Sequence, residues 1–271
     1  MKKLKESGMK RTILTGVLVA TAGFSGLLAQ QPAEPAAPKA PAVKKVTQEE
    51  QKAWDAVLKA ADPDAAIKAA EELMTKFADT PYKEAALSAE AQAYKEKGDR
   101  DQAQVFAGRV LEVNPKNYAM ELMLGEVIEG RMRNADLDLK ENVAKCTHLF
   151  NDAIDNVKVA VKPNPTIPDA EWPNDQKFLI AQAHYDLGIL LLIQKKPDDA
   201  IKEFQQAIDG DPAQDAFVAQ LAKAYSDANK FAECIAACDR LLAKPDLNAR
   251  IKSYVTSIKN LAVASAKAAA K

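Results

Sequence analysis

Apolar residues recur at helical spacing from about residue 47 to residue 268 of this chain. Isolated prolines separate the helical segments, at positions 63, 81, 115, 197, 212 and 245. Pro81 and Pro115 are 34 positions apart, and Pro212 and Pro245 are 33 positions apart. This period is typical of a repeated pair of helices, because one pair cannot bury its own apolar face and must stack on its neighbours.

The repeat is clearest in the segment AQAHYDLGILLLIQKKPDDAIKEFQQAIDGDP, residues 181–212. Leu187 and Gly188 stand in its first helix, and Ala200, Phe204 and Ala207 stand in its second helix. With these residues the chain resembles the tetratricopeptide repeat (TPR) family, which has Leu-Gly in the first helix and Ala-x3-Phe-x2-Ala in the second. Small residues at Gly188 and Ala200 would let the two helices approach closely, with Phe204 filling the space beside them.

The resemblance implies an all-α fold, an α-solenoid of antiparallel helix pairs with an enlarged central unit and a C-terminal capping helix. The central unit is enlarged because Ile128 and Cys146 are 18 positions apart where the family pattern has nine. An insertion of about nine residues around RMRNADLDL would account for this spacing. Within a repeat domain of residues 47–268 we expect units at 47–80, 84–117, 118–160, 181–214 and 215–248, a capping helix at 249–268, and a Pro-rich break at 161–175.

Several residues have the pattern of helix N-caps. Thr47 and Glu50 have the spacing of a capping box. Asp62 and Asp211 each precede a proline, as a cap residue does when proline takes the first helical position. Asp99 follows Gly98 and can cap the next helix. The sequence therefore predicts four helix starts, at residues 47, 62, 99 and 211.

The N-terminal region has the layout of an export signal. A basic start precedes an uncharged stretch from Thr12 to Ala33, and Ala29 is a small residue at a possible cleavage site. We expect residues 1–29 to be a signal peptide, residues 30–46 to be an Ala/Pro/Lys-rich flexible tether, and the protein to be exported to the bacterial periplasm or cell envelope. The alternative is an uncleaved anchor that holds the protein at the inner membrane, facing the periplasm, where it would assist envelope protein assembly.

The charge balance argues against nucleic acid as a partner. The net charge is -1, and removing residues 1–29, with five basic and one acidic side chains, would leave -5. A protein without a basic field does not hold the phosphate backbone. The content of 48% hydrophobic and only 6% aromatic residues, with many alanines, favours helices over a β-sandwich or barrel.

The sequence contains no motif that requires an enzyme. The glycines after residue 30 are not clustered into a phosphate-binding loop, and no HExxH or paired CxxC spacing occurs. We therefore expect no catalytic residues, no cofactor and no metal. The thiols of Cys146, Cys234 and Cys238 are interpreted as small core residues, although Cys234 and Cys238 could form a redox pair in an oxidising compartment.

The resemblance implies that the first helices of successive units line a concave groove that binds a protein or peptide segment. Carrying the groove positions over to this sequence gives the candidate residues Gln92, Lys95, Glu126, Glu129, Tyr185, Ile189, Leu192 and Lys223. The set lacks the Asn and Arg with which some relatives hold a carboxylate-terminated tail. We expect an exported, non-catalytic scaffold whose partner is another protein, of unknown identity.

Residues 178–193, FLIAQAHYDLGILLLI, are apolar nearly all round, so this helix should be covered on more than one side. Either the Pro-rich break folds back over it with Ile167 and Trp172, or a partner's apolar segment lies on it. A different class of function is an envelope enzyme or a glycan or small-ligand binder that uses the Pro-rich insertion. Trp172, Glu171 and Asp175 would form its site, as a stacking aromatic ring beside carboxylates.

Overall fold

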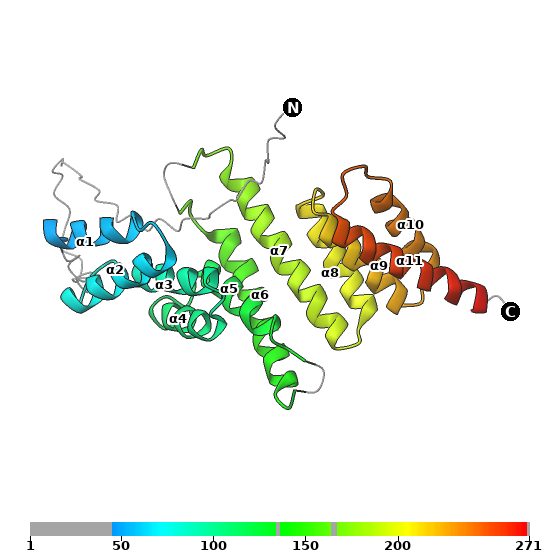
Figure 1. Cartoon of the computed structure of the whole chain (residues 1–271), viewed down its shortest axis with the longest axis horizontal. Coiled ribbons are helices and arrows are strands. Elements are labelled where there is room, and N and C mark those ends of the chain that lie inside the picture. Colours follow the sequence, from blue (N-terminus) through cyan, green and yellow to red (C-terminus); the bar gives the residue numbers. More distant parts are fainter. Residues whose placement is uncertain (1–44, 134–135, 164–166, 270–271) are drawn as a thin grey trace, which may run out of the picture.

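Antiparallel helix pairs follow one another along the long axis of the molecule in the computed structural model (Figure 1). The structure describes residues 45–133, 136–163 and 167–269. These residues form eleven helices and no strand, which confirms the all-α solenoid. The helices are α1 Gln48–Leu58, α2 Pro63–Lys76, α3 Lys83–Glu96, α4 Arg100–Val113, α5 Tyr118–Glu129, α6 Leu139–Val159, α7 Trp172–Ile193, α8 Pro197–Gly210, α9 Asp215–Asp227, α10 Phe231–Leu242 and α11 Ala249–Ala269.

Each helix packs mainly on the helices next to it in the chain. Two pairs approach closely at a glycine. A Cβ atom built on Gly125 of α5 would lie 2.4 Å from Cε1 of Phe150 on α6, and one on Gly188 of α7 would lie 2.5 Å from Cε1 of Phe204 on α8. Both phenylalanine side chains are fully buried. The same glycine–phenylalanine contact therefore sets the distance between the two helices in both units.

Three of the four predicted N-caps are present. Thr47 and Glu50 form the capping box at α1, and the carboxylates of Asp62 and Asp99 accept hydrogen bonds from the backbone N–H of the third residue of α2 and of α4, at 2.8 and 3.1 Å. The cap predicted at Asp211 is wrong. Its carboxylate accepts from the backbone N–H of Ala213 in a turn, and α9 begins only at Asp215.

The central unit is enlarged, as the sequence predicts. Residues 130–138 connect α5 to α6, and α6 and α7 contain 21 and 22 residues, whereas α5 contains 12. The connection from α6 to α7 is shorter than the predicted Pro-rich break, because α7 already begins at Trp172 with Pro173 in its first turn. Proline is tolerated there, since the first N–H groups of a helix have no partner within it.

Helix α11 closes the C-terminal end of the solenoid, as expected for a capping helix. Its Val255, Ile258 and Ala262 are buried in one cluster with residues of α9 and α10, while Leu261 on its outer side is 63% exposed. The predicted signal peptide and all but the last two residues of the predicted tether lie outside the described residues. Among the helices that the structure describes, none has the length and apolar character needed to span a bilayer.

Candidate partner-binding groove

A groove lies across the first helices of three successive units, α3, α5 and α7. Its central hollow, of about 230 Å³, is lined by apolar side chains from α5 and α7 and by polar side chains from α3, α5 and α7. Three of the predicted site residues, Gln92, Lys95 and Glu126, line this hollow. We call this surface the α3/α5/α7 groove. The helices position these residues because Gln92 and Lys95 are three apart on α3, and Glu126 projects from the facing side of α5.

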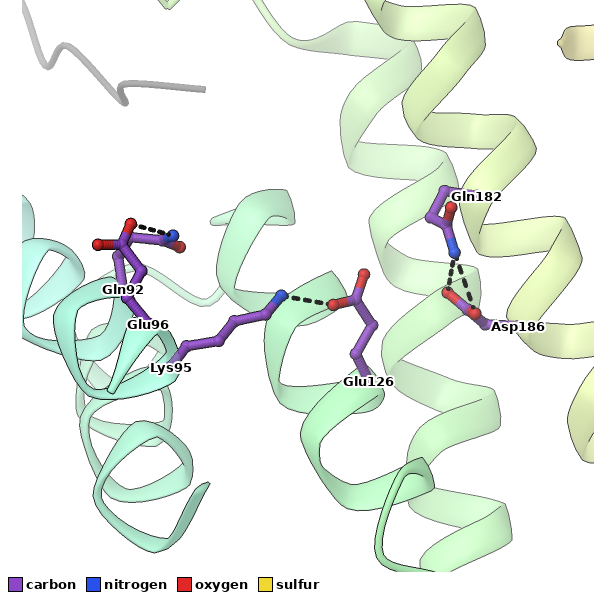
Figure 2. Close-up of polar contacts among 6 residues, drawn as sticks. All are labelled: Gln92, Lys95, Glu96, Glu126, Gln182 and Asp186. Carbon is purple, nitrogen blue, oxygen red and sulfur yellow. Dashed lines mark hydrogen bonds and ion pairs between the residues drawn. The ribbon is translucent and has the colours of Figure 1, made fainter. Parts of the chain in front are cut away.

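An ion pair crosses the groove from one unit to the next. Figure 2 shows Lys95 of α3 reaching to Glu126 of α5, with 2.6 Å between Nζ and Oε2. The two side chains are 40% and 34% exposed, so solvent reaches the pair. Next to it, the Gln92 side-chain amide donates to the Glu96 carboxylate at 3.0 Å. A solvent-screened ion pair of this kind contributes at most about 1 kcal/mol to stability, so a competing group can replace one partner.

A buried carboxyl group lies on α7 beside this ion pair. Asp186 is only 4% exposed, and the side-chain amide of Gln182 donates to both of its carboxylate oxygens at 3.2 Å (Figure 2). Burial, followed by the charges of Glu129 and Glu126, raises the pKa of Asp186 to about 8. Asp186 therefore holds a proton over much of the neutral range.

Glu129, one turn after Glu126 on α5, belongs to the same group of acids. Burial, followed by the charge of Glu126, raises the pKa of Glu129 to about 7. Its Oε2 atom is buried without a hydrogen-bond partner among the described residues. The groove thus places three acidic side chains, Glu126, Glu129 and Asp186, close enough to affect one another's ionisation, with one lysine, Lys95, at the entrance.

The other predicted groove residues have different surroundings. The ring of Tyr185 packs between helices, with ring centroids 5.9 Å from Phe204 and 5.0 Å from Phe217. Ile189 and Leu192 are half-buried against the cluster that contains Phe204. Lys223 lies on α9 and forms an ion pair with Asp227 of the same helix. The structure therefore places Gln92, Lys95 and Glu126 around one hollow, with Glu129 within reach of the charge of Glu126, and it uses the predicted α7 residues chiefly for packing.

The apolar sequence of α7 is explained by its neighbours. This helix packs between α6 and α8 and also contacts α5 and α9. Trp172 belongs to the helix itself, where its ring packs 6.5 Å from that of Tyr118 and its Nε1–H donates to the carbonyl of Ala160 at 3.2 Å. The indole is thus part of the packing between α5 and α7, and not a free stacking surface beside Glu171 and Asp175.

The cysteines occupy the core. Cys146, Cys234 and Cys238 are fully buried free thiols, which confirms the interpretation as core residues. Burial raises the pKa of both Cys146 and Cys238 to about 12, so neither provides a thiolate at neutral pH. The described residues contain no group of three or more His, Cys, Asp or Glu side chains placed to hold a metal ion.

Asp186 and Gln182 were not among the predicted site residues. A signal for them exists in the sequence, because Asp186 is the only charged residue in the 16-residue run 178–193, and buried acids in such runs need a specific partner. The family pattern directed attention to Tyr185, the residue before Asp186, whose side chain lies on a different face of the helix.

Two segments of the chain match family models described as "Tetratricopeptide repeat", at residues 85–117 and 191–258. The fold is also similar to that of pilF from Pseudomonas aeruginosa, with 13% sequence identity over 80% of this chain and 90% of that chain, and a TM-score of 0.53. The structure of MamA from residue 41 onward, from Desulfovibrio magneticus RS-1, is similar with 16% identity over 74% of this chain and 100% of that chain, and a TM-score of 0.50. No curated protein matches the sequence at a significant level. At these identities the similarity to solved structures concerns the fold alone.

Proposed function

Since the chain is a tetratricopeptide repeat protein, we propose that it is a non-catalytic scaffold that binds a segment of another protein in the α3/α5/α7 groove. The observation that carries this proposal is the groove itself. It combines a hollow with apolar walls and polar groups at the entrance, on the first helices of three stacked units. Peptide-binding grooves have this combination, because apolar contacts provide affinity and a few polar groups fix register.

The unusual ionisable groups of the described residues support a scaffold over an enzyme. Asp186, Cys146 and Cys238 have strongly raised pKa values, and the largest cause in each is burial in the packed interior. His184 is paired with Glu203 on the neighbouring helix, with 2.7 Å between Nδ1 and Oε2. We assign structural roles to the Cys146 and Cys238 thiols and to the His184–Glu203 pair, which lie between packed helices, whereas Asp186 lies beside the groove.

The proposed location is the bacterial periplasm or cell envelope. The proposal rests on the basic start, the uncharged stretch and the Ala/Pro/Lys-rich segment that follows it. N-terminal sequencing of the protein purified from its native cells tests this: a start at Gln30 supports cleavage and export. A start at or near Met1 in membrane fractions would instead support the anchored form, which would present the same groove to the periplasm.

Site-specific photo-crosslinking in cells tests the groove. A benzophenone amino acid at Gln92, which is exposed in the groove, is expected to crosslink a discrete protein. The matched control is the same amino acid at Glu112, an exposed position on α4 outside the groove. Crosslinks of equal pattern and yield from both positions, or none from Gln92 with a folded protein, would refute the assignment of the groove.

A further inference from the structure

We propose that the α3/α5/α7 groove selects a partner segment that carries a lysine or arginine next to an apolar side chain. This inference rests on the proposed function and adds to it the chemistry of the partner. The basic group would enter between α5 and α7 at Glu126, and the apolar side chain would occupy the adjoining hollow.

The charge of the groove is the first argument. Glu126 and Glu129 on α5 and Asp186 on α7 lie within reach of one another's charge, and Lys95 opposes them by lowering the pKa of Asp186. Near pH 8, where most of Glu129 and about half of Asp186 are ionised, the negative charge of the cluster exceeds the one positive charge of Lys95. A partner's ammonium or guanidinium group would reduce this repulsion, whereas a carboxylate would increase it.

The existing ion pair is the second argument. Lys95 reaches Glu126 from the neighbouring unit, so the structure already places one primary ammonium group in this position. The pair is solvent-accessible on both sides, at 40% and 34% exposure, and such pairs exchange partners at low cost. A lysine from a bound segment can therefore join or replace Lys95 without unfolding any part of the groove.

The apolar part of the groove is the third argument. Tyr118 and Phe178 are half-buried at the hollow, and the buried side chains of Leu122 and Met123 also line it. Methionine and aromatic side chains adapt to apolar groups of different shapes. The hollow of about 230 Å³ adjoins Glu126, so a basic residue and an apolar residue close together in a partner segment can contact both at once.

Proton release would accompany such binding. Asp186 and Glu129 take up protons near neutral pH, and a bound cation would lower the pKa of both carboxyls. The other ionisable groups that face them are Lys95 of α3, Glu126 of α5, Cys146 of α6 and Tyr185 of α7. The two neutral groups, the Cys146 thiol and the Tyr185 phenol, have pKa values raised to about 12, so they stay neutral as the acids ionise. Affinity for a basic segment should therefore rise between pH 6 and pH 8.

Fluorescence anisotropy with the full chain tests the proposal. The probes are three labelled 12-residue peptides with identical leucine and alanine positions and with Lys, Gln or Glu at the remaining positions. The Lys peptide should bind most tightly, with an affinity that increases about threefold or more from pH 6 to pH 8, because lysine keeps its charge over this range. Equal affinity for the Lys and Gln peptides, preference for the Glu peptide, or no measurable binding of any of them would overturn the proposal.

Matched variants separate the groove from the general acidity of the protein. At pH 8, Glu126→Gln should weaken binding of the Lys peptide by about tenfold and Asp186→Asn by about threefold or more, and both should reduce its pH dependence. Glu72→Gln and Asp155→Asn remove the same charges from exposed positions on α2 and α6, and they should change the affinity less than twofold. Circular dichroism confirms that each variant is folded. Equal effects of groove and control variants would show that only net charge is sensed, which overturns the proposal.

Two further results distinguish the possible failures. If deleting residues 30–46 raises the affinity for the Lys peptide, the chain's own lysines in this segment compete for the groove, and the proposal of a separate basic partner is wrong. If crosslinking at Gln92 captures a partner whose binding does not respond to Glu126→Gln, Asp186→Asn or pH, the proposed function stands and the basic specificity fails. Absence of any crosslink from position 92, in a folded protein with no further substitution, would refute the proposed function itself.

Discussion

The contact between Gly188 and Phe204 makes a quantitative prediction about stability. In a Gly188→Ala variant the new Cβ would lie 2.5 Å from Cε1 and 2.8 Å from Cδ1 and Cζ of Phe204. Carbon atoms in proteins pack at about 3.5–4.0 Å, so the methyl group would overlap the ring by roughly 1 Å. The ring is fully buried between α7, α8 and α9 and cannot turn into solvent. Either α7 and α8 move apart or the ring leaves its rotamer.

The expected magnitude follows from two opposing effects. Overpacking of this kind costs about 1–3 kcal/mol. Replacing glycine by alanine inside a helix returns up to about 1 kcal/mol, because the unfolded chain loses conformational freedom. We expect the free energy of unfolding to fall by about 1–2 kcal/mol. For a repeat domain of this size, that corresponds to a decrease in Tm of roughly 2–8 °C.

Urea and thermal unfolding, followed by circular dichroism at 222 nm, measure the effect. Gly108→Ala is the matched control, because Gly108 also lies within a helix, α4, but a Cβ there meets nothing within 4 Å. The control should be more stable than the unaltered protein by up to about 1 kcal/mol. The same chemical change should thus have opposite signs at the two positions. A Gly188→Ala protein as stable as the unaltered chain would refute the argument. So would a Gly188→Ala substitution that costs as much stability in a Phe204→Leu background as in the unaltered chain.

Three more predictions concern a buried acid, a helix cap and a long-range hydrogen bond. Asp186 has a raised pKa, so the native state keeps a proton that the unfolded state releases. The free energy of unfolding should therefore fall as the pH rises from 6 to 8. Asp186→Asn should remove about 2 kcal/mol of this decrease, as measured by urea titrations at the two pH values. Thr47→Ala should lower stability by about 1 kcal/mol through loss of the α1 capping box, while Thr47→Ser should not, as compared by their urea midpoints. Trp172→Phe removes the donor to the Ala160 carbonyl and should lower the free energy of unfolding by about 1 kcal/mol in urea titrations. An unchanged free energy of unfolding would count against a role for this hydrogen bond.

The local features of the fold could be predicted from the sequence because they depend on neighbouring residues. Gly188, Ala200 and Phe204 lie within one helix pair, so the family spacing is sufficient to place them in contact. Thr47 and Glu50 lie within one turn. The prediction of a cap at Asp211 was wrong for a related reason. The sequence shows a residue that can cap a helix, but three more residues form a turn before α9 begins, and this turn depends on how α8 and α9 pack.

Features that join different units were harder to predict. Glu126 and Asp186 are 60 positions apart, and their proximity depends on the rotation from one unit to the next, which repeat spacing does not specify. Tyr185 occupies a groove position in the family pattern, yet its ring turns to Phe217 of the following unit. The predicted residues of α3 and α5 therefore lie around one hollow with the ion pair, whereas Tyr185 of α7 packs between helices, and their role in binding stays a prediction.

The C-terminal helix has a consequence for how the protein is made. Because helices pack mainly on their chain neighbours, the early pairs can assemble as they are synthesised. The apolar surface of α9 and α10, including Val218, Cys238 and Leu241, is covered only when α11 supplies Val255 and Ile258. A chain interrupted before α11 would carry correctly folded early units and an uncovered apolar end, so premature termination there should yield an aggregation-prone species in place of a shorter working scaffold.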